Sequence, residues 1–189
     1  MSKLSLELPL GVNKWALDHI VGLVTEPYLE TEKFEFKRQL YSQEPDYNDK
    51  LTTTACAFAN AGGGFIIFGV KDLGEADGVD RIEGIPLSDD LANDFGQKIA
   101  RAAPTIHFEP GNPPIRLTNG KVVFIVQIPM SATRPHMTGH ELFYIRTNTG
   151  NTHMTYEQVR DAFAGYQERT YKAQYLFLSF RLFTQTLDS

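Results

Sequence analysis

Hydrophobic and polar residues alternate in the segment KFEFKRQL, which begins at Lys33. Phe34 and Phe36 fall on one face of an extended chain, and Glu35 and Lys37 fall on the other. This period of two predicts a strand with one buried face. A carboxylate in the middle of this strand is either the solvated side of an ordinary amphipathic strand or one arm of an acidic site.

Apolar residues at helical spacing predict three helices in the first hundred residues. Their expected ranges are 13–24, 46–61 and 88–99. Asn13 and Ser88 stand where the first and third of these helices need an N-cap. In the first helix, Leu17, Ile20 and Val21 are expected to share the apolar face. Glycines at 62–64 are expected to end the second helix.

The segment GFIIFGVKD is apolar on both faces, which predicts a covered central strand that stops at Asp72. Further strands are expected in TIHFEP, PIRLT, KVVFIVQIP and ELFYIRTN, with an Asn-Gly turn between the second and third. A last helix opens within THMTYEQVRDAFAGYQ, where Thr155 and Gln158 form a capping-box pattern. The order predicts an α+β fold, in which helices pack on one mixed β-sheet and a long helix ends the chain.

We expect an N-terminal helical segment at 1–26, a main domain at 27–165 and a C-terminal helical extension at 166–189. The extension continues a seam of residues at alternating steps of four and three. The seam consists of Val159, Phe163, Tyr166, Thr170, Ala173, Phe177 and Phe180. Such a helix packs on its own domain, which we slightly favour, pairs with a second copy in a homodimer, or docks on another domain.

The chain carries a net charge of −5 over 189 residues, so a nucleic-acid site would have to be a local basic strip or use metal ions as bridges. Its single cysteine, Cys56, excludes an internal disulfide and fits a reducing compartment. Neither a signal peptide nor an apolar run of membrane-spanning length is present. We therefore expect a cytoplasmic protein without a membrane partner.

Other motifs favour structural roles. The glycines of NAGGGF follow a helix and precede a strand, which is the reverse of a phosphate-binding loop and argues against ATP. Asn60 beside them could still bind a ligand. His136 and His140 lack cysteine partners, which argues against zinc. Cys56 lies among alanines on the apolar side of its helix and is expected in the core.

Three carboxylates are the candidate chemistry: Glu30, Glu35 and Asp72. Glu30 and Glu35 converge only if Glu30 lies on a turn before the strand, since five positions along one strand lead to opposite faces. Converged carboxylates without their own cations would repel one another, so a trio of this kind implies a bound divalent metal ion. Taken alone, Glu35 is better explained as a solvated strand residue.

ETEKFEFKRQL, ACAFANAGGGFIIFGVKD, KVVFIVQIPMSATRPH and ELFYIRTNTG together resemble the Schlafen-type Alba domain, also called the divergent AAA domain, from about Glu30 to about Phe163. The resemblance implies an Alba-like, Schlafen-core topology. For the ribonuclease members it also implies that Glu30, Glu35 and Asp72 are catalytic ligands of Mg²⁺ or Mn²⁺. Lys37 matches the lysine of the family motif.

We therefore expect a nucleic-acid-binding domain that acts as a metal-dependent endoribonuclease on structured, tRNA-like RNA, with phage defence as a role suggested by bacterial relatives. Candidate contacts to the nucleic acid are Lys37, Arg38, Lys71, Arg134 and Arg146. The alternative is a non-catalytic module that binds RNA, DNA or a nucleotide for regulation, or an assembly unit of a larger protein.

Overall fold

The computed structural model describes residues 8–26 and 32–187, and for residues 175–187 it describes only the course of a helix. A five-stranded mixed sheet forms its centre. The strands of this sheet are β1 (Phe34–Lys37), β2 (Gly64–Phe68), β3 (Glu109–Pro110), β4 (Ile115–Arg116) and β5 (Val122–Ile128). Their order is β1-β2-β5-β3, and β4 also pairs with β5. The β1–β2 pair is parallel and the β2–β5 pair is antiparallel, as a mixed sheet requires.

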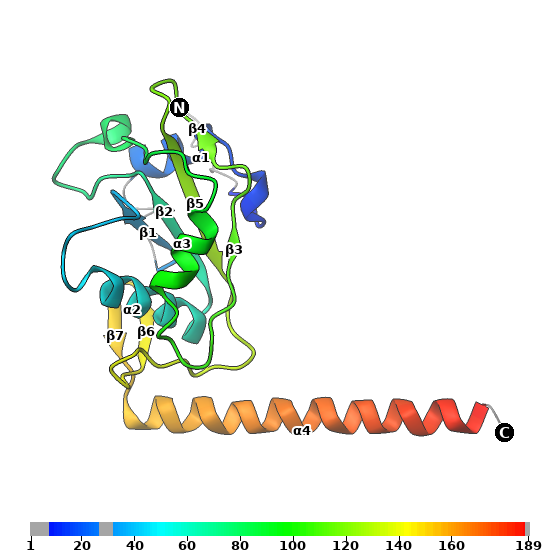
Figure 1. The fold of residues 1–189 in the computed structure, drawn as a ribbon. Coiled ribbons are helices and arrows are strands. Elements are labelled where there is room, and N and C mark those ends of the chain that lie inside the picture. The colour runs from blue at the N-terminus through cyan, green and yellow to red at the C-terminus, as the bar shows by residue number, and fades with distance from the viewer. Residues whose placement is uncertain (1–7, 27–31, 188–189) are drawn as a thin grey trace, which may run out of the picture.

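Helices cover both faces of this sheet (Figure 1). The structure as a whole describes the helices η1 (Val12–Lys14), α1 (Leu17–Thr25), α2 (Tyr47–Asn60), η3 (Gly78–Arg81), α3 (Leu91–Lys98) and α4 (Tyr156–Leu187). One hydrophobic core joins α2 and α3 to the sheet, and a second core joins η1 and α1 to its other face. The α+β fold predicted from the sequence is confirmed.

The alternation in β1 decides where Glu35 lies. Phe34 and Phe36 are buried in the core beneath α1, as predicted. Glu35 therefore points to the opposite face, in register with Ile66, which belongs to the α2 core. Because β1 is the edge strand of the sheet, a polar side chain on this face can reach the surface beside α2.

The glycines after α2 are a helix end, as predicted. The Gly63 amide donates to the carbonyl oxygen of Phe58 at 3.0 Å, and Gly63 has a φ of 73°. A side chain there would also lie 2.7 Å from the carbonyl oxygen of Ile128. Glycine is required at this position by both the left-handed backbone and the close approach of β5.

Two predicted helix starts are wrong. Residues 12–14 form the short helix η1, and α1 starts only after Ala16, whose amide donates to Nδ1 of His19 at 2.9 Å. Asn13 is therefore no N-cap, and its Oδ1 instead accepts a hydrogen bond from the Asn112 amide at 3.0 Å. The buried face of α1 carries Ile20, Leu23 and Val24 rather than Leu17 and Val21. The N-cap position of α3 is Asp90, not Ser88, and its side chain makes no capping hydrogen bond.

The predicted strands also need corrections. β2 ends at Phe68, because Gly69 has a φ of 94° and turns the chain, so Asp72 follows the strand rather than ending it. ELFYIRTN contributes β6 (Tyr144–Thr147), which pairs with the unpredicted strand β7 (Gly150–His153). This hairpin forms a sheet of its own beside α2. The Asn-Gly turn between β4 and β5 is confirmed.

The capping box of α4 is confirmed by reciprocal hydrogen bonds between Thr155 and Gln158, at 2.8 and 3.3 Å. The start of α4 contacts the domain, where Phe163 meets Phe143 and Arg169 donates to the carbonyl oxygen of Ala132. Beyond that point α4 runs away from the domain as a single helix (Figure 1). The expectation that this helix packs along its own domain is therefore wrong for most of its length.

None of the helices described in the structure is both long and apolar enough to cross a membrane.

Candidate functional site

Glu35 is held between two cations. Its Oε1 lies 2.7 Å from Nζ of Lys37, and its Oε2 accepts a hydrogen bond from Arg146 at 2.8 Å. The side chains of Glu35 and Arg146 are only 19% and 9% exposed. An ion pair this far buried is held in place by its hydrogen bonds, so Glu35 is not an ordinary solvent-exposed residue of an amphipathic strand.

Arg146 anchors the β6–β7 hairpin to the sheet. Besides Glu35, its guanidinium donates to Oδ1 of Asn151 at 3.0 Å and to the carbonyl oxygen of Phe34 at 2.7 Å. It also lies over the ring of Phe58, 4.9 Å from the ring centre. A nearly buried guanidinium with these partners is not free to bind a phosphate, so the predicted nucleic-acid contact at Arg146 does not fit this arrangement.

A cleft of about 510 Å³ opens beside Glu35, between the start of α2, the edge of the sheet and the β6–β7 hairpin. It is lined by Glu35, Lys37, Asp46, Asp49, Lys50, Thr53, Thr54, His140, Tyr144 and Asn151. Asn151 links the two walls, because its Nδ2 donates to Oγ1 of Thr54 at 2.9 Å. We call this the hairpin cleft.

A second cleft of about 410 Å³ adjoins it, around the carboxyl end of β1 and the loop that follows β2. It is lined by Lys37, Arg38, Gln39, Ser42, Glu44, Tyr47, Lys50, Asp72 and Glu75. We call this the strand-end cleft. Lys37 and Lys50 line both clefts and therefore stand at their junction. Lys50 is paired with Glu44 at 3.3 Å and with Asp46 at 3.1 Å.

The structure places Glu35 in the hairpin cleft and Asp72 in the strand-end cleft, on either side of Lys37. Glu30 lies outside the described residues. Within 8–26 and 32–187, the described residues contain no group of three or more side chains suited to hold a metal ion. Carboxylates that hold a metal ion would lack cations of their own, whereas Glu35 is paired with two, Lys37 and Arg146. The described residues thus fit a resident metal ion poorly in this arrangement.

Arg38 and Lys71 gather at another carboxylate, Glu83. Three cations lie 3.1, 3.9 and 3.3 Å from its oxygens: Arg38, Lys71 and Lys121. Burial raises the pKa of Glu83, but the hydrogen bond from Lys121 and the nearby Arg38 guanidinium outweigh it and lower the pKa overall. This cluster extends the charged surface from the strand-end cleft toward the β4–β5 turn.

Arg134 lies at the other end of α2. Its guanidinium donates to the carbonyl oxygen of Ser131 at 2.9 Å. The Ser131 amide in turn donates to the carbonyl oxygen of Ala59, in the last turn of that helix. Burial, together with the neighbouring Arg169 guanidinium, lowers the pKa of Arg134. Because Lys50 lies in the first turns of α2, the structure does not bring Arg134 together with the clefts.

Asn60 has a structural role, which argues against the ligand contact considered from the sequence. Its Nδ2 donates to the carbonyl oxygens of His136 and Tyr144 at 2.8 and 2.9 Å, and its Oδ1 accepts the His136 amide at 2.6 Å. The buried amide thereby ties α2 to two later segments. Cys56 is buried as predicted, and burial raises the pKa of its thiol to about 12.

Among the lining residues of the hairpin cleft that sequence patterns did not assign to the site are Lys50, Asp49, His140 and Asn151. Lys50 and Asp49 lie on the exposed side of α2, where charged residues are ordinary. The HMTGH spacing did single out His140, but as a weak metal motif. Only the contact between the hairpin and α2 brings these four side chains together.

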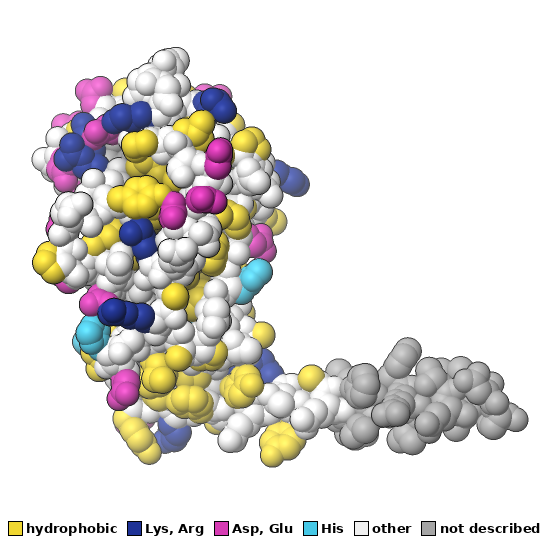
Figure 2. Space-filling model, viewed as in Figure 1, with side chains coloured by type: hydrophobic (Ala, Val, Ile, Leu, Met, Phe, Trp, Pro, Cys, Tyr) yellow, Lys and Arg dark blue, Asp and Glu magenta, His cyan; other side chains and the backbone are white. Residues whose placement is uncertain are grey.

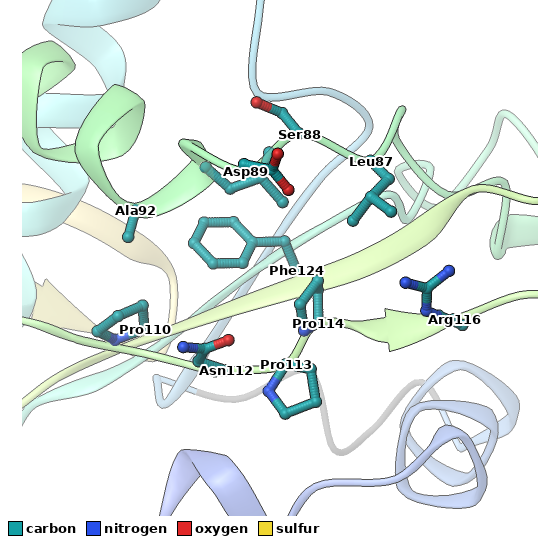
Figure 3. A pocket seen from close by; sticks show the side chains of 12 residues that line it. Leu87, Ser88, Asp89, Ala92, Pro110, Asn112, Pro113, Pro114, Arg116 and Phe124 are labelled. Atoms are coloured by element: carbon teal, nitrogen blue, oxygen red, sulfur yellow. The ribbon is translucent and has the colours of Figure 1, made fainter.

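A separate pocket of about 290 Å³ lies between the start of α3 and the loop before β4 (Figure 3). Leu87 and Ala92 face Pro113 and Pro114 across the ring of Phe124. Among the described residues that line it, Arg116 is the only cation. This pocket is therefore a poorer match for a phosphate backbone than the two clefts.

A model of the family described as Schlafen, AlbA_2 matches residues 30–155, more than half of the 189-residue chain. The chain belongs to this family. Membership in the Schlafen AlbA_2 family indicates that the domain binds nucleic acid. The matched range includes both clefts and ends just before α4.

Among solved structures, the DIP2311 protein from Corynebacterium diphtheriae is 20% identical to this Schlafen AlbA_2 chain, with a TM-score of 0.46. The match covers 66% of this chain and 22% of that protein, so this chain spans about a fifth of its length. No curated protein matches the chain.

Proposed function

We propose that this domain binds structured, tRNA-like RNA and holds its phosphate backbone in the two adjoining clefts. The observation that carries the proposal is the position of Lys37 and Lys50, which line both clefts. A backbone that passes from one cleft to the other would meet both ammonium groups. Phosphate contacts of this kind supply most of the affinity of proteins for nucleic acids.

The ion pairs of Lys50 are compatible with phosphate binding. Lys50 and its partners Glu44 and Asp46 are each about 60% exposed, so water and salt screen these pairs and leave them weak. A phosphate can therefore replace a carboxylate at low cost. Before RNA binds, the paired carboxylates hold the lysines beside the clefts and weaken nonspecific binding of other polyanions.

Neutral groups in the hairpin cleft complement the lysines. Thr53 offers a hydroxyl group, and Asn151 a second amide N–H, that can bond phosphate or ribose oxygens. Tyr144 lines the same cleft, and an unpaired base can stack on a tyrosine ring. This combination suits RNA with exposed bases better than it suits a uniform duplex.

The test is RNA affinity as a function of salt, by fluorescence anisotropy with a labelled tRNA-like hairpin. Replacing both Lys37 and Lys50 by Gln should reduce the slope of log K against log salt by roughly 1.5, since each lost phosphate contact removes about 0.7–0.9. The matched control is Lys14→Gln with Lys172→Gln, two exposed lysines outside the clefts. Equal slopes for the cleft variant and the control would refute the proposal.

Metal-dependent endoribonuclease activity is the second candidate, favoured by the carboxylates on either side of Lys37. In it Glu30, Glu35 and Asp72 would hold Mg²⁺ or Mn²⁺, and Glu35 would have to exchange Lys37 or Arg146 for the ion. Calorimetric titration with Mn²⁺ tests this. Binding that Asp72→Asn abolishes and Asp89→Asn leaves intact would support it, whereas no binding to the unmodified protein would reject it.

A further inference from the structure

His140 and Asp49 form a hydrogen-bonded pair on the wall of the hairpin cleft. Nε2 of His140 lies 3.1 Å from Oδ2 of Asp49. An ionised carboxylate only accepts hydrogen bonds, so in the neutral imidazole this contact places the hydrogen on Nε2 and the lone pair on Nδ1. A neutral imidazole oriented by a carboxylate in this way is able to take a proton from a substrate.

The loop that carries His140 has a defined conformation. The Thr138 amide donates to the carbonyl oxygen of Leu142 at 2.9 Å, and the Glu141 amide donates to that of Thr138 at 2.9 Å. Glu141 has a φ of 61°, a strained conformation for a residue other than glycine. Gly139 packs so closely on Arg101 that an added Cβ would lie 3.0 Å from it. Backbone strain of this kind is concentrated at functional sites, and here it sits beside His140.

The surroundings supply the other groups that cleavage of RNA needs. Arg101 lies 3.7 Å from the second oxygen of Asp49 and helps to fix that carboxylate. The charged groups that line the same cleft are Glu35, Lys37, Asp46 and Lys50. The two lysines can neutralise the charge that develops on a phosphate under attack.

We propose that His140 is a general base for metal-independent cleavage of RNA in the hairpin cleft, and that Asp49 is its positioning residue. This proposal rests on the proposed binding of RNA in that cleft. It assigns the substrate class more narrowly, because the reaction needs the 2′-hydroxyl of ribose.

In the proposed step, Nδ1 of His140 takes the proton of the 2′-hydroxyl as the 2′-oxygen attacks the adjacent phosphorus. A bond forms between the 2′-oxygen and phosphorus, and the bond from phosphorus to the 5′-oxygen breaks. The proton on His140 then passes through a water molecule to the departing 5′-oxygen. The products are a 2′,3′-cyclic phosphate and a 5′-hydroxyl, with no net change in protons and no oxidation.

The experiment uses the full chain with a 5′-labelled RNA hairpin and its all-2′-deoxy counterpart, in EDTA. We expect cleavage of the RNA alone, with a 2′,3′-cyclic phosphate end. His140→Ala should lower the rate by about 10²- to 10⁴-fold, as loss of a general base does. Its affinity for the hairpin should change less than threefold, and added imidazole should restore part of the rate. His107→Ala, at an exposed histidine outside the cleft, is the control.

Asp49→Asn should lower kcat while KM changes little, because the imidazole loses the carboxylate that orients it, and Asp49→Glu should restore part of the rate; a merely structural role would raise KM as well and would not be rescued by Asp49→Glu. If the unmodified protein binds RNA but does not cleave it in EDTA, the proposal for His140 fails and RNA binding stands. If it does not bind RNA, the proposed function itself fails. Cleavage that His140→Ala leaves unchanged, or equal cleavage of the deoxy hairpin, would also overturn the proposal.

Discussion

At the scale of single residues, Glu35 shows how a carboxylate is retained in an apolar edge strand. Lys37 is two residues away in the same strand, whereas Arg146 comes from β6 and is nearly buried. The pairing links the edge of the sheet to the hairpin that forms the cleft. The same side chain therefore supports the structure of the site and lines it.

Glu35→Gln should destabilise the protein, since it leaves the nearly buried Arg146 without its carboxylate. The expected loss is about 1–3 kcal/mol, because Arg146 keeps its bonds to Asn151 and Phe34. An uncompensated acidic trio would instead predict a gain in stability. Urea unfolding decides the sign, with Glu109→Gln in the exposed part of β3 as the control. An unchanged or raised midpoint would contradict the pairing.

Buried His136 should make stability depend on pH. Burial lowers the pKa of His136, although the hydrogen bond to Pro104 acts in the opposite direction. The unfolded chain therefore binds this proton first as the pH falls. The contribution of neutral His136 to the free energy of unfolding is complete above the unfolded pKa of about 6.5. It is lost as the pH falls toward the lower pKa of the folded protein.

We expect His136→Gln to flatten the fall in the free energy of unfolding between about pH 7 and pH 5. The comparison is with His107→Gln, at an exposed histidine, in denaturant melts at several pH values. Parallel curves for the two variants would show that His136 does not carry this dependence.

At the scale of elements, prediction from the sequence succeeded where local periodicity is strong. β1, α2, β2 and β5 have clear periods of two or 3.6 or continuous apolar runs, and the structure contains all four. β7 was missed because its sequence, GNTH, has no hydrophobic alternation. It is a strand because β6 pairs with it and because Arg146 and Thr54 bond Asn151.

The same reason limits prediction of the site. Glu35 and Lys37 could be named from the sequence because the alternation in β1 positions them, and Asp72 because it closely follows the apolar strand β2. Arg146, the second partner of Glu35, lies 111 positions away in the sequence, and no local pattern indicates this pairing. Lys50 and His140 likewise join the cleft only through tertiary contacts between α2 and the hairpin.

α4 leaves the domain with aromatic residues on its surface, and Figure 2 shows hydrophobic side chains gathered where it departs. Phe163 and Tyr166 belong to the predicted seam and are 48% and 40% exposed. A helix of this length gains most of its stability from packing, so we propose that a second copy covers the seam.

Tyr166→Ser should therefore weaken self-association at least tenfold in sedimentation velocity over a dilution series. Tyr171→Ser is the matched control, because Tyr171 is 71% exposed and lies off the seam. A monomer at all concentrations, or equal loss from both variants, would contradict pairing through the seam.

At the scale of the whole molecule, acidic and basic side chains lie interspersed on the face shown in Figure 2. With a net charge of −5, the protein does not attract RNA over its whole surface. Binding then depends on one region where phosphate can displace weakly held carboxylates. The junction of the two clefts at Lys50 meets that description, and the Glu83 cluster adjoins it.

Amide hydrogen exchange of the full chain, with and without a tRNA-like hairpin, tests this placement most directly. We expect slower exchange on RNA binding in residues 44–54 and 138–151, which include the walls of the hairpin cleft. Residues 87–92, at the separate pocket beside α3, should exchange at the same rate in both states. Protection confined to residues 87–92, or to the 131–135 loop around Arg134, would contradict the account.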